Sequence, residues 1–323
     1  MAIFKFYNIQ LLPINNDISE VGDNGYCRLF ESVKDLIDES KIHRRKLSSI
    51  GVKMRGEMFF APFSLSFHEY DKENNKKIIY GSFLKFDDVN ELVDTNSGQT
   101  EYRSKGNTSS KRYDLEFYFD PSTHVLAIQD ARGLPTRKPL IDALYKILAF
   151  HSRNLFENHS LEIDELTSAE SISEFLQLPK KGYKSYKGVV TFSNSDGFDD
   201  GVEEILMETE GELKDKNVGK WESSYKSFPH SVMNDLPDQA KVQMALATRY
   251  GNAEVSYLDD DGIRKKYQME DYPVREQLKE NEHKGMKGKA VAVMGLIKKA
   301  IRRTRSNPSA VRENKKFLDG VGE

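Results

Sequence analysis

The sequence predicts an α+β fold with largely antiparallel sheets, packed helices, two subdomains and a basic helical C-terminus. First, several pairs of alternating apolar segments are separated by short turn sequences, which is the pattern of β-hairpins. Second, the segments between these pairs have apolar residues at every third or fourth position, as in amphipathic helices. Third, the stretch from Lys284 to Lys316 is rich in Lys and Arg, which sets it apart from the rest of the chain.

Residues 1–160 are expected to form an N-terminal α+β domain. The elements expected, in order, are a strand at 4–12, a helix at 26–40, a hairpin at 63–86, a hairpin at 115–128 and a helix at 140–155. The Gly- and Ser-rich segment Asn96–Ser110 has no apolar period and is expected to be a loop. His151 shares the apolar face of the second helix, so it is interpreted as a core histidine.

Residues 161–282 are expected to form a second α+β domain, followed by a basic helical segment at 283–323. The elements expected, in order, are a helix that starts at the capping box Thr167–Glu170, a strand at 189–192, a helix at 237–250 and a hairpin at 253–269. The charged residues 274–282 are interpreted as a connector.

Composition indicates a globular protein in a reducing compartment. Hydrophobic residues make up 38% of the chain, which is enough to build packed cores. The single cysteine, Cys27, allows no internal disulfide. No stretch has the apolar length needed to cross a bilayer, and the N-terminal residues do not have the pattern of a secretory signal. We therefore expect a cytoplasmic location.

The basic stretch Lys284–Lys316 contains eleven Lys and Arg residues and one acidic residue, Glu313. The whole chain has a net charge of −3, so the remainder is strongly acidic. A helix over Lys289–Arg305 would gather its apolar residues on one face and its cations on the other, and Asn307-Pro308 would end it. We therefore expect binding to nucleic acid, either DNA or RNA, through phosphate contacts. The expected contact residues are Lys287, Lys289, Lys298, Lys299, Arg302, Arg303, Arg305, Arg312, Lys315 and Lys316.

Three other interpretations of this helix remain open. It can be a solvated surface helix with no partner. The acidic body of the protein can neutralise the cations, which would make the stretch a structural strap. Alternatively, the apolar face can bind a second copy or another protein through Val293, Met294, Ile297 and Ile301. A membrane surface is disfavoured because the apolar face is short and contains no Trp or Phe.

Two further basic clusters can extend a nucleic-acid surface. One follows the first helix and consists of Lys41, His43, Arg44, Arg45 and Lys46. The other spans 180–187 and interleaves lysines with Tyr183 and Tyr186, which suits the stacking of unpaired bases. A flexible loop is the alternative interpretation of the second cluster.

The segment Arg153–His159 resembles the Arg-x(4–6)-His signature of the HEPN ribonucleases. The resemblance implies that His159 acts as general acid or base on a ribose 2′-hydroxyl and that Arg153 stabilises the phosphorane charge. Asn154 would be the polar residue that follows the arginine. HEPN domains are all-helical, whereas Leu161-Glu162-Ile163 is compatible with a strand. A ribonuclease is therefore the alternative function.

Two acidic patterns have the spacing of metal sites. Asn194, Asp196, Gly197 and Glu203 match part of an EF-hand loop, but Phe192 stands where the loop needs its first oxygen ligand. Asp199 or Asp200 with Glu212 and Lys214 has the spacing of a PD-(D/E)xK nuclease core. The residues around Glu212 are polar, whereas that core needs a buried strand. We therefore assign no metal ligands and expect no cofactor, with Mg²⁺ only if the protein is a nuclease.

Two hairpin segments carry a resemblance of layout. FYFDPSTHVLAI (117–128) and YGNAEVSYLDDDGIRKKYQMEDYP (250–273) resemble segments of uncharacterised bacterial proteins found near phage-defence and mobile-element genes. This resemblance implies a role in antiphage defence. It implies no chemistry, because both segments are structural hairpins.

Overall fold

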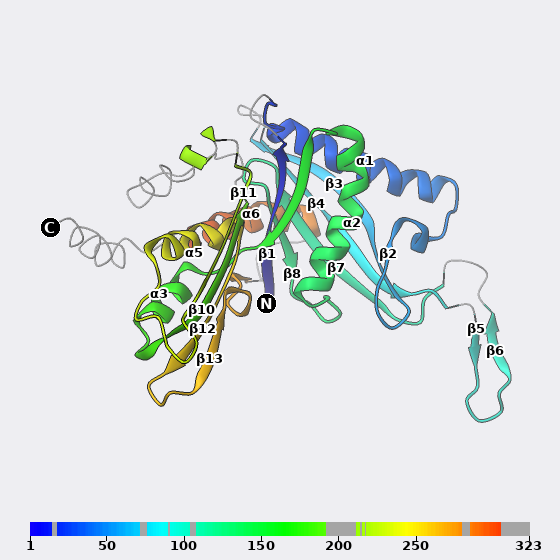
Figure 1. Cartoon of the computed structure of the whole chain (residues 1–323). Helices are drawn as coiled ribbons and strands as arrows, with labels where there is room; N and C mark the ends of the chain where they lie inside the picture. Colours follow the sequence, from blue (N-terminus) through cyan, green and yellow to red (C-terminus); the bar gives the residue numbers. More distant parts are fainter. Residues whose placement is uncertain are drawn as a thin grey trace. The chain divides into compact units, whose positions relative to one another are not determined.

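The computed structural model describes residues 1–14, 18–71, 76–89, 91–103, 108–191, 211–213, 215–216, 218–279 and 285–304. It confirms the α+β class, with antiparallel sheets and packed helices (Figure 1). The chain divides into two compact units. Unit 1 contains Met1–Phe4, Val21–Ile163 and Gln277–Ile297, and unit 2 contains Lys5–Glu20, Asp164–Glu276 and Lys298–Glu323. The domain boundaries expected at 160 and 282 stay a prediction, because units defined by contacts need not coincide with segments that fold alone.

The larger sheet has the strand order β14-β1-β8-β7-β4-β3-β2, and β9 also pairs with β1. Its strands are β1 (Ala2–Pro13), β2 (Val52–Lys53), β3 (Met58–Asp71), β4 (Lys76–Asp87), β7 (Arg112–Asp120), β8 (Val125–Gln129), β9 (His159–Glu165) and β14 (Arg275–Leu278). The pairs from β2 to β8 are all antiparallel, which confirms both predicted hairpins of the first half. The register of β3 and β4 places Phe60 opposite Lys85 and Leu65 opposite Gly81.

Helices α1 (Gly22–Ile42) and α2 (Arg137–Leu155) pack on each other and on β3 of unit 1. Phe30 of α1 stacks on Phe119 with ring centroids 4.6 Å apart. His151 is 3% exposed, and its Nδ1 lies 2.8 Å from the Ser32 hydroxyl, so it joins α2 to α1. Burial lowers the pKa of His151. The prediction of a core histidine is confirmed.

Two segments without a clear apolar pattern contain strands. The expected loop at 96–110 includes part of a hairpin formed by β5 (Glu91–Val93) and β6 (Thr100–Arg103), which projects from the other strands of unit 1 (Figure 1). Its residues are exposed, so no buried face imposes an alternating pattern on them. The expected connector at 274–282 includes β14, where Glu276 and Leu278 are buried and alternate with exposed residues.

Unit 2 contains a second antiparallel sheet with the order β11-β10-β12-β13. Its strands are β10 (Lys180–Thr191), β11 (Lys220–Lys226), β12 (Gly251–Asp259) and β13 (Arg264–Gln268). Helix α5 (Asp238–Tyr250) packs on β10 and β12, and α3 (Ala169–Gln177) packs on α5. The core is rich in aromatic rings; Phe175 stacks on Tyr267 with centroids 4.2 Å apart. The helices predicted after Thr167 and at 237–250 are confirmed, as is the hairpin at 253–269. The capping box is not formed, because Ser168 precedes the first helical residue and makes no side-chain cap hydrogen bond.

Helix α6 (Gly285–Arg303) confirms the predicted basic amphipathic helix. Its apolar face is buried: Ala290, Val293 and Ile297 are each 0% exposed. The short 3-10 helices are η1 (Leu47–Ile50) and η2 (Met269–Asp271). Across the described ranges, no helix combines the length and the apolar character that crossing a membrane requires.

Candidate nucleic-acid interface

Three of the cations expected to contact phosphate in α6 are paired with carboxylates of the protein itself. In unit 1, the Lys289 ammonium lies 3.1 Å from Glu116. In unit 2, Lys299 lies 2.6 Å and Arg303 3.2 Å from the carboxylate of Glu276, which is only 4% exposed. A buried carboxylate needs such partners because its desolvation is costly. These contacts favour the strap interpretation for this part of α6.

The other cations of α6 face solvent. Lys287, Lys298 and Arg302 are exposed and form no ion pair with another described residue. Lys298 and Arg302 are four positions apart on the helix, where like charges repel each other. A bound anion would relieve that repulsion. Arg305, Arg312, Lys315 and Lys316 lie outside the described residues.

The lysine and tyrosine cluster at 180–187 is part of strand β10 in the unit 2 sheet, so the flexible-loop interpretation is wrong. Tyr183 is 4% exposed and Tyr186 1% exposed, which leaves neither ring available to a base. The Lys180 ammonium donates to the carbonyl oxygens of Phe175 and Leu176, at 2.7 and 3.2 Å, and so satisfies the C-terminal end of α3. This cluster is therefore structural.

The ribonuclease candidates lie at the junction of α2 and β9 in unit 1. Arg153 and Asn154 are exposed in the last turn of α2, whereas His159 begins β9 and packs edge-on against Phe156. The all-helical surroundings that the HEPN resemblance implies are therefore absent from this part of the chain. The roles of Arg153, Asn154 and His159 stay a prediction.

The acidic candidates are only partly described. Residues 192–210 and Lys214 lie outside the described residues, so neither the EF-hand pattern nor the nuclease pattern can be placed. Glu212 is described and pairs with Lys216 one helical turn away. Among the described residues, no three His, Cys, Asp or Glu side chains come together as a metal site would require.

The basic cluster at 41–46 lies at the C-terminal end of α1, where the chain turns sharply. The N–H of Arg45 donates to the Ser40 carbonyl, and the N–H of His43 donates to Glu39, both at 2.9 Å. Arg44 has φ of +49°, the left-handed conformation that usually follows a helix at Gly. This turn places Lys41, Arg44 and Lys46 around one cavity.

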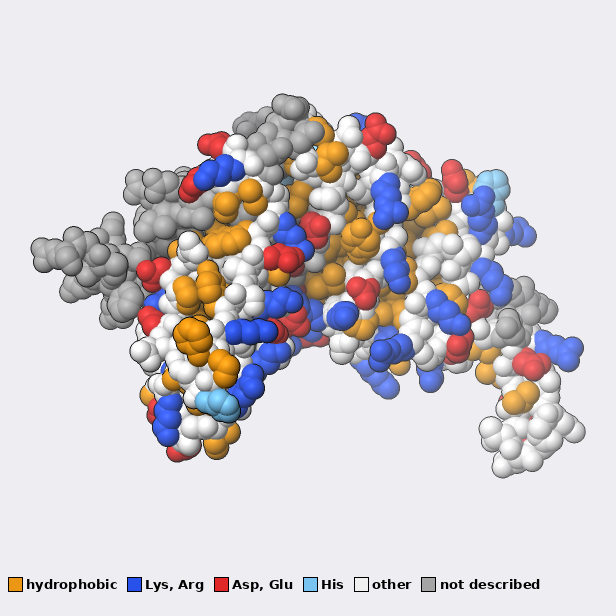
Figure 2. Space-filling model, in the orientation of Figure 1, with side chains coloured by type: hydrophobic (Ala, Val, Ile, Leu, Met, Phe, Trp, Pro, Cys, Tyr) orange, Lys and Arg blue, Asp and Glu red, His pale blue; other side chains and the backbone are white. Residues whose placement is uncertain are grey.

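We call this cavity the α1 pocket; its volume is about 720 Å³, and it lies entirely within unit 1. Lys and Arg side chains gather on the surface around the end of α1 (Figure 2). The lining residues are Ile37, Ser40, Lys41, Arg44, Arg45, Lys46, Leu47, Ser48, Ile50, Phe63, Leu84, Phe86, Asp88, Thr108, Ser109 and Arg112. Five of these side chains are cationic and one, Asp88, is a carboxylate.

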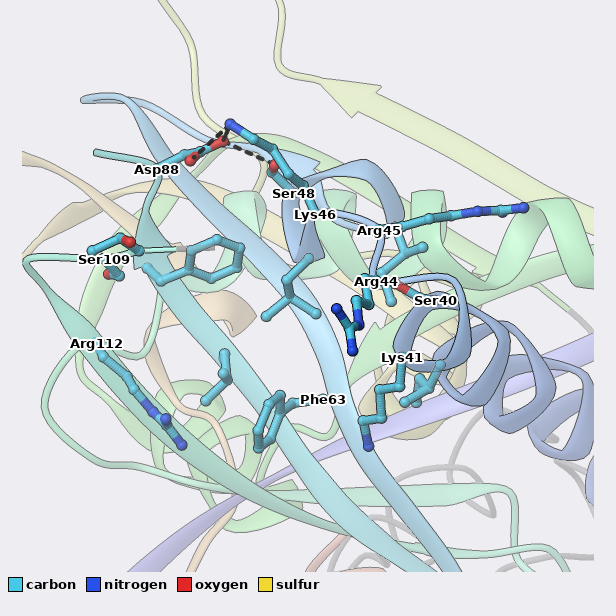
Figure 3. Close-up of a pocket in the computed structure, with 16 residues that line it drawn as sticks. Ser40, Lys41, Arg44, Arg45, Lys46, Ser48, Phe63, Asp88, Ser109 and Arg112 are labelled. Carbon is cyan, nitrogen blue, oxygen red and sulfur yellow. Dashed lines mark hydrogen bonds and ion pairs between the residues drawn. The ribbon is translucent and has the colours of Figure 1, made fainter. Parts of the chain in front are cut away.

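One end of the α1 pocket is formed by cations around an aromatic ring. The Lys41 ammonium and the Arg112 guanidinium lie 5.5 and 5.1 Å from the centroid of Phe63. Figure 3 shows Phe63 between these two side chains with Arg44 beside them, whereas Arg45 extends away. Arg112 also donates two hydrogen bonds to Asp114, which fix its guanidinium. Lys41 and Arg44 form no ion pair among the described residues.

The other end of the α1 pocket carries the carboxylate of Asp88. Asp88 accepts a hydrogen bond from the Ser48 hydroxyl at 3.0 Å and pairs with Lys46 at 3.4 Å (Figure 3). The neighbouring Asp87 anchors the segment that contributes Ser109. Burial raises the pKa of Asp87, but hydrogen bonds from Ser109, Ser110 and the Lys111 N–H outweigh burial and lower the pKa to about 2.

The sequence identified only one wall of this pocket. The cluster at 41–46 is visible as a run of basic residues, whereas Phe63, Asp88 and Arg112 come from three other segments of the chain. Antiparallel pairing of β3, β4 and β7 brings them to the end of α1. No local spacing could have revealed them, because the register of long strands sets their proximity.

A family model described as "Domain of unknown function (DUF4747)" matches residues 5–298. The chain belongs to the DUF4747 family. No curated protein matches it significantly. All residues of the α1 pocket lie within the part that matches DUF4747, whereas Lys299, Arg302 and Arg303 of α6 follow it.

Proposed function

We propose that this DUF4747 protein binds nucleic acid and that the α1 pocket is its principal contact with phosphate. The observation that supports this most strongly is the grouping of Lys41, Arg44 and Arg112 at one end of the cavity, where Lys41 and Arg44 form no ion pair with a described residue. Guanidinium groups donate paired hydrogen bonds that match phosphate oxygens, and Arg44 brings such a group to this end of the cavity. Such a site binds phosphate independently of sequence.

Compensation of the helix dipole is the simplest alternative role for these cations. The C-terminal end of a helix carries a partial charge of about −0.5, which one or two basic residues offset. Lys46 pairs with Asp88, whereas Lys41 and Arg44 both line the pocket without an ion pair to a described residue. Arg112 comes from β7 and has no part in the helix end. The positions of Lys41 and Arg44 beside Arg112 therefore favour an external anion.

Helix α6 is proposed as a secondary contact. Its exposed Lys287, Lys298 and Arg302 can meet further phosphates, whereas Lys289, Lys299 and Arg303 are occupied by carboxylates. A role in antiphage defence would be compatible with nucleic-acid binding and stays a prediction.

Fluorescence anisotropy with labelled single-stranded RNA, single-stranded DNA and duplex DNA tests this proposal. We expect binding that weakens as salt increases, because each phosphate contact releases counterions. The double variant Lys41→Gln/Arg44→Gly should weaken binding by about tenfold or more, since a charge-assisted hydrogen bond contributes roughly 1.5–3 kcal/mol. Lys34→Gln removes one charge from the same helix outside the pocket and should bind like the wild type. Absence of binding to all three probes would overturn the proposal.

A further inference from the structure

The α1 pocket is large enough to hold a ligand and not only a counterion. Its volume of about 720 Å³ lies within the range of roughly 300–1,000 Å³ found for small-molecule sites. A lone phosphate contact on a surface groove needs no such cavity.

The two ends of the pocket differ in the charge of their side chains. Lys41, Arg44 and Arg112 surround Phe63 at the first end, and Ser48 and Asp88 lie at the second (Figure 3). The lining also contains apolar side chains, among them Leu47 and Leu84. The complementary ligand has an anionic group, an apolar or flat part and hydrogen-bond donors at its far end.

The carboxylate of Asp88 restricts the kinds of ligand that the α1 pocket can bind. A carboxylate inside a cationic pocket repels anions, so a purely anionic ligand such as inorganic phosphate or sulfate would gain by its removal. Asp88 instead accepts hydrogen bonds from hydroxyl or amino groups, as it does from Ser48 at 3.0 Å. An alkyl chain offers no such donors. Nucleotides carry them on both the ribose and the base.

The aromatic ring of Phe63 positions the two neighbouring cations and does not stack on a base. Because Lys41 and Arg112 already lie at its faces, the ring holds the two cations in place by cation–π contacts. Prior positioning reduces the entropy lost when they bind a phosphate. The base would then lie over the apolar part of the pocket.

We propose that the α1 pocket binds a nucleoside monophosphate, with its phosphate among Lys41, Arg44 and Arg112 and its donors directed to Asp88. This inference rests on the proposed function, because it assigns one nucleotide of the bound strand to the pocket. The same chemical unit can be the phosphorylated end of a strand or a free nucleotide. The two sources differ only in whether a chain continues beyond the pocket.

Isothermal titration of the full-length protein with AMP, adenosine, inorganic phosphate and dodecyl phosphate tests the chemical class. We expect AMP to bind at least about tenfold more tightly than adenosine or phosphate, because it contacts both ends of the pocket. Arg44→Gly should weaken AMP by about tenfold and leave adenosine unchanged. Asp88→Asn should weaken AMP and strengthen phosphate, whereas Lys34→Gln should change neither. AMP binding no tighter than phosphate, or no tighter than dodecyl phosphate, would overturn the inference.

Competition experiments separate the two sources and separate this inference from the proposed function. A labelled strand is titrated with and without a 5′-phosphate, and AMP is added as competitor. A preference for the 5′-phosphorylated strand that AMP abolishes supports a strand end. Tight AMP binding with no strand binding supports a free nucleotide and overturns the proposed function. Salt-dependent strand binding that neither AMP nor the end phosphate affects overturns the nucleotide pocket and leaves the proposed function standing.

Discussion

Arg44 occupies a backbone position where glycine would be more stable. Its φ of +49° places it in the left-handed region directly after α1, where a side chain with a Cβ costs about 1 kcal/mol. Non-glycine residues held in such conformations are often found at functional sites. The guanidinium of Arg44 lines the α1 pocket, so the strain and the proposed phosphate contact belong to the same residue.

Substitutions of Arg44 should therefore affect the free energy of unfolding and the ligand affinity differently. We expect Arg44→Gly to raise the free energy of unfolding by about 1 kcal/mol and Arg44→Ala to leave it nearly unchanged, because only glycine relieves the left-handed strain. Both variants should lose affinity for phosphate-bearing ligands to the same extent. Urea denaturation measures the first effect and anisotropy the second. Equal stability of the two variants would contradict the strain argument.

Asp87 should make the segment around Ser109 sensitive to acid. Its folded pKa of about 2 is lower than its unfolded value, so it stabilises the fold above about pH 4 and loses this effect as the pH falls towards 2. Because the side chain is partly open to solvent, we expect Asp87→Asn to cost only about 1 kcal/mol at neutral pH. The difference in unfolding free energy between the two proteins should shrink as the pH falls from 4 and vanish below about pH 2. A difference that persists there would show that the hydrogen bonds of Asp87 do not depend on its charge.

At the scale of secondary structure, the sequence predicts elements with one buried face and misses those without one. α1, α2 and α6 were predicted because each buries a single stripe of apolar residues. The sequence predicted only the last residues of strand β10. Register shifts near Lys180 and Ser185 interrupt the alternation of its side chains, which hides the rest of the strand. The α1 pocket was only partly predictable, because the pairing of strands that are distant in the sequence sets the positions of Phe63, Asp88 and Arg112.

Glu276 and Glu116 should hold different parts of α6. Glu276 is buried and pairs with Lys299 and Arg303, while Glu116 pairs with Lys289 near the start of the helix. We expect Glu276→Gln to lower the unfolding free energy by about 1–2 kcal/mol and to speed hydrogen exchange at 298–304. Glu116→Gln should have the smaller effect and act at 286–292. Identical exchange patterns in the two variants would show that these pairs do not anchor the helix separately.

At the scale of the whole chain, positive charge has two different uses. A net charge of −3 gives no indication of affinity for nucleic acid, since anionic and cationic regions nearly cancel. In α6, Lys289 and Lys299 are neutralised by Glu116 and Glu276, whereas Lys41 and Arg44 of the α1 pocket form no ion pair with a described residue. A run of basic residues therefore marks a binding surface only when the fold does not supply its counter-charges.

The central claim, that the α1 pocket contacts the phosphates of a nucleic acid, is tested most directly by the salt dependence of affinity. The affinity of a 5′-phosphorylated single strand is measured at several salt concentrations for the wild type, Lys41→Gln/Arg44→Gly and Lys34→Gln. Loss of two phosphate contacts should reduce the slope of log affinity against log salt by about 1.4, with Lys34→Gln unchanged. Equal slopes for all three proteins would contradict the claim.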